Sequence, residues 1–142
     1  MRNLNAAQRM GHYSKNLGPL ADEVVTECEF VTLDQKRRVK AVRTMWDTGS
    51  NATILSTALI RELCPDLFGQ GGMKGIGGES ENNTYLMHII LPTGDVITYQ
   101  EVYAGELSEC DAIIGMDIIN LGHFHLDLCQ GETTFTFSLP NE

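Results

Sequence analysis

The chain has 142 residues, a formal net charge of −9 and a pI near 4.8. That length fits a single domain with a core large enough to need no metal or disulfide support. Nucleic acids and anionic membrane surfaces repel an acidic protein, so neither is expected as its main partner. The basic residues cluster once, in "KRRVK" from Lys36, and we interpret this cluster as a solvated turn between two strands.

Cysteine usage points to a reducing compartment. The four cysteines are spread along the chain without a C-x-x-C pair, which predicts buried free thiols rather than a disulfide framework or a zinc site. They are Cys28, Cys64, Cys110 and Cys129. His123 and His125 share one strand face, but no third ligand lies near them in sequence, so we expect no metal. Because no signal peptide or membrane span is visible, we expect a cytoplasmic protein.

The first 22 residues are predicted to form a polar arm, free to be flexible, ahead of a β-rich domain over residues 23–142. The segments "VVTECEFVTL" and "RVKAVRTMW" alternate in period two around the polar turn "DQKR". This pattern predicts a hairpin whose second strand runs directly into Asp47. The carboxylate of Asp47 is therefore expected at the end of a strand.

The remaining segments continue the β pattern with one or two short helices. A helix is predicted in "STALIREL", which begins with hydroxyl residues and spaces Leu59, Ile60 and Leu63 along one face. A glycine-dense stretch, "GQGGMKGIGGES", precedes two apolar strands joined by the turn "PTGD". The apolar "AIIG", a possible helix in "MDIINLG", and strands in "HFHLDL" and "TTFTFSL" follow.

The stretch "MWDTGSN" carries the chemistry. A single carboxylate cannot activate water and protonate a leaving group at the same moment, whereas two carboxylates about 3 Å apart share a proton and can do both. One such Asp47 per chain therefore suggests two chains. Gly49 allows a tight backbone turn, and the hydroxyls of Thr48 and Ser50 can donate hydrogen bonds. The alternative is an ordinary loop in which Asp47 caps a turn.

The glycine-dense stretch has its own alternative. Glycine-rich loops can bind phosphate groups, but neither the dinucleotide-binding pattern nor a P-loop Lys-Ser/Thr follows here. The flanking segments also read as two strands rather than a strand and a helix. A nucleotide site is therefore disfavoured, and a mobile hairpin tip is the better interpretation.

Three segments in order, "WDTGSNATILS", "MKGIGGE" and "CDAIIGMDII", resemble the catalytic loop, flap tip and apolar-apolar-Gly segment of retropepsin-like aspartic proteases. The resemblance covers residues 24 to 139. It implies an all-β fold: a closed retropepsin-like (acid protease) β-barrel or sandwich with one or two short helices, assembled as a homodimer. The run "IIGMDII" looks most similar to the cellular and bacterial members of this family.

The resemblance also implies site residues. Asp47 matches the catalytic aspartate, Thr48 the threonine that reaches across the dimer, and Gly49 the turn glycine, with Ser50 completing the motif. The flap residues match Gly75, Ile76, Gly77 and Gly78, whose backbone would hydrogen-bond an extended peptide. Ile113, Ile114 and Gly115 match the segment packed beneath the catalytic loop, with Ile114 assigned to substrate binding, and Asp117 opens the helix that follows.

Three features depart from the retroviral pattern. Ser50 stands where retroviral members usually carry Ala, and it could donate to Asp47 and favour its ionised form. Trp46 is bulky for its position and is explained only by core packing. Glu79, Ser80 and Glu81 make the flap acidic, which could favour basic substrates but is explained as well by a solvated face.

The function expected from these observations is an aspartic endopeptidase. Water held between two Asp47 carboxylates of a homodimer would attack the peptide carbonyl, with no metal or organic cofactor. The expected partners are a second copy and an extended peptide or protein substrate. The alternative is a non-catalytic module that keeps the fold for dimerisation or peptide binding. In "TTFTFSL", Phe135, Phe137 and Leu139 share one face, which suits either a dimer sheet or an ordinary core strand.

Overall fold

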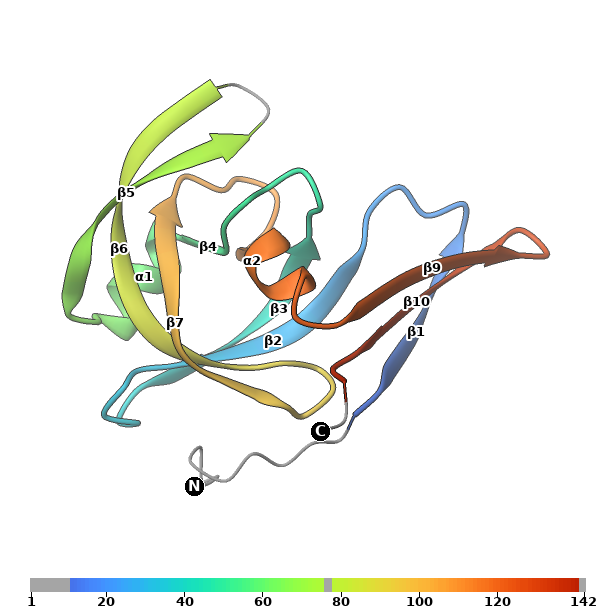
Figure 1. Ribbon diagram of the computed structural model, residues 1–142, viewed down its shortest axis with the longest axis horizontal. Coiled ribbons are helices and arrows are strands. Elements are labelled where there is room, and N and C mark those ends of the chain that lie inside the picture. The colour runs from blue at the N-terminus through green and yellow to red at the C-terminus, as the bar shows by residue number, and fades with distance from the viewer. Residues whose placement is uncertain (1–10, 76–77, 141–142) are drawn as a thin grey trace.

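The computed structural model describes residues 11–75 and 78–140, with the backbone alone for residues 72–75 and 78–81. Ten strands and two short helices follow one another along this part of the chain (Figure 1). In chain order they are β1 (Tyr13–Pro19), β2 (Val25–Val31), β3 (Arg38–Trp46), β4 (Ile54–Ser56), α1 (Thr57–Leu63), β5 (Leu67–Gly75), β6 (Gly78–Ile90), β7 (Val96–Gly105), β8 (Ala112–Ile114), α2 (Met116–Ile119), β9 (His123–Cys129) and β10 (Glu132–Ser138).

The larger sheet closes into a barrel. Its strand order is β2-β3-β8-β4-β7-β6-β5, and an additional antiparallel pairing of β2 with β6 joins the sheet into a ring of six strands. Two of the pairings, β3 with β8 and β4 with β7, are parallel, so the barrel is mixed. Strand β5 lies outside the ring and pairs only with β6. The all-β barrel expected from the sequence is thus confirmed, as are both short helices.

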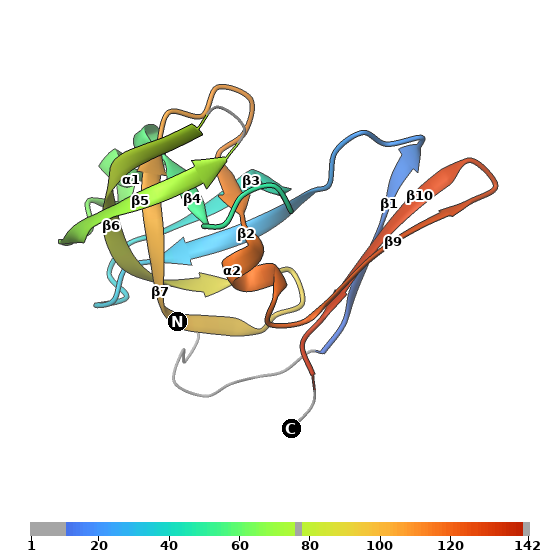
Figure 2. The same ribbon diagram turned by 45° about the horizontal axis from the view of Figure 1, so that its top comes forward.

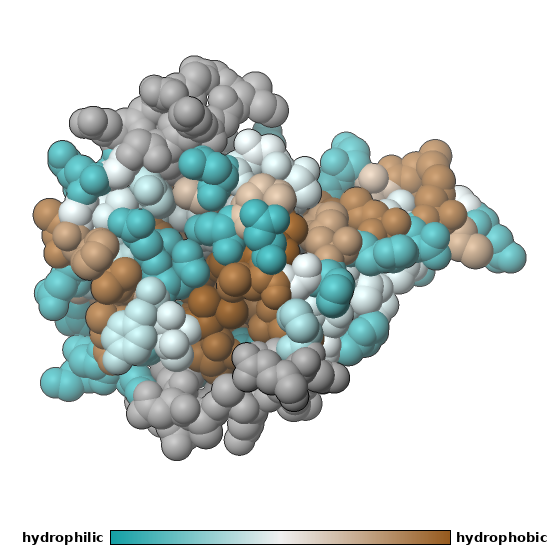
Figure 3. Space-filling model, viewed as in Figure 1, coloured by the Kyte–Doolittle hydropathy of each residue, from teal (hydrophilic) through white to brown (hydrophobic). Residues whose placement is uncertain are grey.

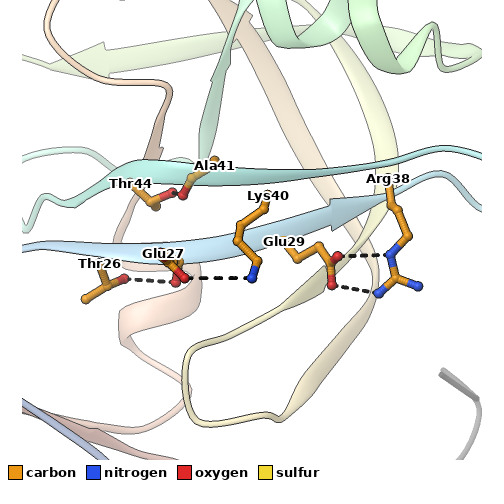
Figure 4. Close-up of polar contacts among 7 residues, drawn as sticks. All are labelled: Thr26, Glu27, Glu29, Arg38, Lys40, Ala41 and Thr44. Atoms are coloured by element: carbon orange, nitrogen blue, oxygen red, sulfur yellow. Dashed lines mark hydrogen bonds and ion pairs between the residues drawn. The ribbon is translucent and has the colours of Figure 1, made fainter. Parts of the chain in front are cut away.

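The β2–β3 hairpin has the predicted position and turn. Its outer face carries two cross-strand ion pairs, drawn in Figure 4. Arg38 donates from Nε and Nη2 to the two carboxylate oxygens of Glu29 at 2.9 and 2.6 Å, and Lys40 lies 3.9 Å from Glu27. Since these groups are partly or largely exposed, we expect each pair to add less than about 1 kcal/mol to stability. The hairpin is held mainly by its buried face.

That buried face belongs to one apolar cluster, which fills the barrel. Its completely buried residues come from β2, β4, α1, β6, β7, β8, α2 and β10. Examples are Phe30, Leu55, Leu63, Met87, Ile89, Val102, Ile114 and Ile118. Alternating positions on a strand and one face of a helix supply them, as the period-two and helical patterns require.

Helix α1 begins and ends where the sequence predicts. The hydroxyl oxygen of Ser56 accepts a hydrogen bond from the backbone N–H of Leu59 at 3.2 Å, which is the N-cap geometry. The helix ends at Cys64, which adopts a left-handed backbone conformation with φ of 51° before the proline that follows it. Among the described residues no helix is long and apolar enough to cross a membrane.

A second, three-stranded sheet projects from the barrel (Figures 1 and 2). Its order is β1-β10-β9, with both neighbours of β10 antiparallel. Strand β1 lies inside the segment that the sequence suggested was a polar arm. No local pattern predicts this strand, because "YSKNLGP" has weak apolar alternation and its pairing partner is more than 110 residues away in sequence.

Aromatic side chains join this sheet to the barrel. Phe135 and Phe137 of β10 are completely buried, and their ring centroids lie 5.1 and 4.8 Å from that of Trp46. The indole N–H of Trp46 donates to Thr26 Oγ1 at 2.9 Å. Trp46 is therefore the central contact between β3 and the projecting sheet, and the two phenylalanines serve as core residues within a single chain.

The prediction of four buried thiols is correct for one cysteine. Cys28 is buried, and desolvation raises the pKa of its thiol to about 12. Cys64 and Cys129 are exposed and Cys110 is partly exposed, so the prediction is wrong for these three. Leu63 and Leu128 precede two of these cysteines in sequence, but Cys64 lies past the end of α1 and Cys129 lies at the tip of the projecting β9–β10 hairpin. All four thiols are unpaired with one another.

Candidate active site

Asp47 begins the loop that leaves the end of β3. The last strand residue, Trp46, donates its backbone N–H to the carbonyl of Val24 at 2.9 Å. The backbone N–H of the next residue, Asp47, donates instead to the carbonyl of Ile114 at the end of β8, also at 2.9 Å. Asp47 is thus positioned by two strands that are distant in sequence, at the strand end where the hairpin pattern predicted it.

The carboxylate of Asp47 is held by its own loop. Oδ1 accepts a hydrogen bond from the backbone N–H of Gly49 at 2.7 Å. The carbonyl of Asp47 accepts from the N–H of Ser50 at 3.2 Å, which closes a tight turn. A Cβ at Gly49 would lie 3.1 Å from Oδ1, so glycine allows the close approach of backbone and carboxylate. Asp47 stays partly exposed and Thr48 is exposed, as a reactive group requires.

Ser50 does not have the role that the sequence suggested. It is buried, and its hydroxyl donates to the carbonyl of Ala52 at 2.8 Å rather than to Asp47. Its backbone carbonyl accepts from the N–H of Met116 at 2.8 Å. The hydroxyl therefore stabilises the loop backbone two residues further on, as Ser side chains often do in turns.

The assignment of Ile114 to substrate binding is also wrong for its side chain. Ile114 is completely buried in the apolar cluster, so it cannot contact a peptide. Alternation along β8 directs successive side chains to opposite faces, and the neighbouring Ile113 is only partly buried. Ile114 contributes instead through its carbonyl, which accepts the Asp47 N–H.

Gly115 places this segment directly against the loop that carries Asp47. A Cβ at Gly115 would lie 2.3 Å from the carbonyl oxygen of Ala52 and 2.9 Å from its nitrogen. Both are backbone atoms, so no side chain can move aside. The segment after β8 therefore packs beneath the loop with no room for a side chain at this position, which agrees with the place that the resemblance assigned to it.

Asp117 ties this same loop to two further elements. Its Oδ1 accepts from the hydroxyl of Thr53 at 2.8 Å, and its Oδ2 accepts from the Thr53 N–H at 2.9 Å. Gln100 of β7 donates from Nε2 to Oδ2 at 3.1 Å. Burial raises the pKa of Asp117 against the opposing effect of these donors. Sequence reasoning treated Asp117 only as a helix start and missed Thr53 and Gln100, because nothing local connects residues so far apart.

A concave space opens beside Asp47. It has a volume of about 390 Å³, and its walls include Asp47 and Thr48 on the barrel and Leu17 and Leu126 on the projecting sheet. A second hollow of about 420 Å³ lies at the opposite end of the β2–β3 hairpin, around the turn and the end of α1. The second hollow does not include the Asp47 loop, so the space beside Asp47 is the one that bears on its chemistry.

The glycine-dense stretch forms an antiparallel hairpin. Strands β5 and β6 pair from Leu67 opposite Tyr85 to Gly75 opposite Gly78. The hairpin extends on the side of the barrel where the β3–β4 loop also lies, as both ribbon views show (Figures 1 and 2). Gly75 and Gly78 end the two strands. Ile76 and Gly77, the other two residues assigned to the flap tip, lie outside the described residues.

No group of three or more His, Cys, Asp or Glu side chains in the described part of the chain is placed to hold a metal ion. His123 and His125 are both exposed on β9. The described residues of the site supply the Asp47 carboxylate, its hydrogen-bonded loop and the open space beside it.

Solved structures share this fold. A retropepsin-like aspartic protease from Rickettsia conorii matches with a TM-score of 0.57 and 15% sequence identity, covering 90% of this chain and 93% of that one. The EIAV protease, complexed with the inhibitor HBY-793, matches with a TM-score of 0.53 and 20% identity, covering 71% and 88%. The chain has the retropepsin fold. No protein-family model matches the sequence, and no curated protein matches it significantly.

The β3–β4 loop carries Asp47, and the segment around Gly115 lies beneath it. The β5–β6 hairpin contains the described part of the glycine-dense stretch. At these levels of identity the likeness establishes the fold, and the activity has to be argued from the site.

Proposed function

We propose that this protein is an aspartic endopeptidase that works as a homodimer. Water held between the Asp47 carboxylates of two chains attacks the peptide carbonyl. One Asp47 accepts a proton from the water, and the other donates a proton to the reacting amide. No covalent intermediate, metal or organic cofactor takes part. Two such carboxylates about 3 Å apart cannot both be ionised, so the pair shares one proton.

The observation that carries this proposal is the environment of Asp47. The carboxylate is fixed by a 2.7 Å hydrogen bond from Gly49, stays partly exposed, and faces an open space of about 390 Å³ in a retropepsin fold. A carboxylate that only capped a turn would need no such space. This favours the catalytic interpretation over the structural one.

A second copy of the chain is the partner that completes this site. Leu126 and Leu128 are 49% and 60% exposed, and β9–β10 pairing puts them on the same face as Phe135, toward the barrel. Leu126 lines the space beside Asp47. Apolar side chains gather along the projecting sheet in Figure 3. A two-fold axis beside Asp47 would cover this face and bring two Asp47 carboxylates together, since an isologous interface uses the same patch twice.

The proposed substrate is a peptide or protein segment in extended form. The backbone at the end of the β5–β6 hairpin, at Gly75 and Gly78, is where the peptide would hydrogen-bond, and the resemblance assigns the same role to Ile76 and Gly77. Closure of such a hairpin excludes water and orients the scissile bond. The partly buried Ile113, rather than Ile114, is the β8 side chain available to contact the peptide.

The test is hydrolysis of a mixed peptide pool at several pH values, with and without a pepstatin-like transition-state mimic. We expect inhibitable cleavage with a bell-shaped pH dependence, because activity needs one protonated and one ionised member of the pair. The Asp47→Asn variant is the matched control, since it keeps the shape but cannot share the proton. Peptides left intact by the wild-type protein at every pH would contradict the proposal and favour a non-catalytic module for dimerisation or peptide binding.

A further inference from the structure

Every described partner of the Asp117 carboxylate is a hydrogen-bond donor. Besides the two bonds from Thr53 and the one from Gln100, the N–H of Ile118 donates to Oδ1 at 2.9 Å. An ionised carboxylate accepts all four bonds, whereas a protonated one must turn a hydrogen toward one of these donors. The arrangement is therefore complete only while Asp117 carries its charge.

The hydroxyl of Thr53 connects the Asp117 carboxylate to the segment that holds the Asp47 loop. It donates to Asp117 and accepts a hydrogen bond from the N–H of Gly115 at 3.3 Å. Gly115 in turn follows Ile114, whose carbonyl accepts the N–H of Asp47. A continuous series of contacts thus runs from the Asp117 carboxylate to the backbone of Asp47. Thr53 is completely buried, so water does not replace a bond that is lost there.

The surroundings of Asp117 favour the protonated form of its carboxyl. Burial raises the pKa of its carboxyl, and no Lys, Arg or His of the described residues donates to it. Tyr103 of β7 is a titratable neighbour of Asp117, and Glu101 is a neighbour of Tyr103. Burial, then Glu101 and then Asp117, raises the pKa of the Tyr103 phenol, so these groups share a negative environment. Asp47 is the remaining acid in the loop that Asp117 supports.

We propose that Asp117 is a positioning residue for Asp47: its ionised carboxylate holds the catalytic loop in its working geometry, and protonation weakens that hold, which helps to set the acid limit of proteolysis. The inference rests on the proposed function. It adds a group that acts on Asp47 through Thr53 and Gly115 rather than on the substrate. The Gln100 amide, which also donates to the carbonyl of Glu101 at 3.1 Å, anchors the carboxylate to β7.

The test compares kcat and KM of the wild-type protein and Asp117→Asn across the pH range of activity. Asn has the same shape as Asp. Its side chain, however, places an N–H₂ donor where the Asp117 carboxylate accepts hydrogen bonds. At the pH of maximal wild-type activity we expect kcat to fall about 10- to 100-fold with little change in KM, since a displaced catalytic group costs that much. As pH falls, the wild-type Asp117 becomes protonated and resembles the variant. The ratio of the two rates should therefore approach one at the acid limit.

Two controls separate positioning from general stability. Asp95, in the β6–β7 turn, is a buried aspartate whose Oδ2 accepts from the Thr93 hydroxyl at 2.8 Å, and it lies outside the catalytic loop. Asp95→Asn should lower stability without a pH-dependent rate ratio. Within the network, Thr53→Val should reproduce the effect of Asp117→Asn, because it removes the hydroxyl at similar volume. Thr53→Ser keeps the hydroxyl and should retain activity.

A rate ratio that stays constant with pH would overturn the inference, because it indicates a purely structural role. A ratio of one at every pH would overturn it too. If the wild-type protein cleaves no peptide, the proposed function fails, and the single Trp46, adjacent to Asp47, becomes the readout. A pH-dependent change in Trp46 emission that disappears in Asp117→Asn supports the coupling, and identical titrations of both proteins contradict it.

Discussion

Replacing Gly115 by Ala should displace the catalytic loop. The added Cβ would meet the carbonyl oxygen of Ala52 at 2.3 Å, and real Cβ atoms essentially never approach closer than 3.0 Å. The backbone must therefore move apart by at least the difference, about 0.7 Å, counted from these two distances. A misplacement of about 1 Å at a catalytic group costs about 100-fold in rate, so we expect a loss of about tenfold or more. Overpacking should also lower the free energy of unfolding by about 1–3 kcal/mol.

The assay is kcat with the best peptide from the pool, together with urea unfolding of the same preparations. Gly69→Ala is the matched control, because a Cβ there would lie 3.6 Å from Thr84 Oγ1, an ordinary contact. We expect Gly69→Ala to keep nearly full activity and stability. Wild-type kcat and unfolding free energy in Gly115→Ala would refute the view that this segment fixes the loop by direct backbone contact.

Three further predictions concern groups around the site and in the core. Trp46→Phe should lower the free energy of unfolding by about 2 kcal/mol in urea titrations, from the lost bond to Thr26 and the smaller ring; a loss below about 0.5 kcal/mol would contradict this. Cys28, with a pKa of about 12, should react with a thiol reagent only after unfolding, whereas the exposed Cys64 should react at once; equal native rates would contradict it. Burial lowers the pKa of His88 from 6.5, so its contribution to stability is complete above that pH and is lost as pH falls below it. Urea unfolding should show a smaller pH slope in His88→Gln, and an unchanged slope would exclude His88 as the cause.

Local patterns in the sequence predicted the parts of the fold that are themselves local. The β2–β3 hairpin, helix α1 and the β6–β7 turn each have alternation, a cap or turn residues within one short segment, and the structure confirms all three. The position of Asp47 at a strand end followed from the same alternation. The barrel itself, which depends on the parallel pairings of β3 with β8 and β4 with β7, came from the resemblance rather than from any pattern.

The errors arose where long-range contacts decide the outcome. Strand β1 exists because β10 pairs with it. The Ser50 hydroxyl could equally reach Asp47 or Ala52 by spacing alone, and the turn geometry selects Ala52. Ile114 lies on the buried face of β8 because β3 pairs beside it, which one sequence cannot indicate. Trp46, unexplained by the motif, has a clear role once β10 is placed against it.

The hydrogen-bond network around Asp117 could not be predicted for the same reason, because it depends on long-range contacts. Thr53, Gln100 and Asp117 come from the catalytic loop, β7 and α2, and only the closed barrel brings them together. No spacing rule connects them. The raised pKa of Asp117 is likewise a property of burial and cannot be seen in the order of residues.

The central claim is that one active site needs Asp47 from two chains. It is tested most directly by mixing equal amounts of wild-type and Asp47→Asn protein, with complete subunit exchange verified, and measuring activity per total dimer. With random pairing, only about a quarter of the dimers are wild-type pairs, so we expect activity to fall to about a quarter. Retention of about half the activity would contradict the account. Each chain would then act alone, and Asp47 would need a partner from its own chain, such as Asp22, which lines the same space.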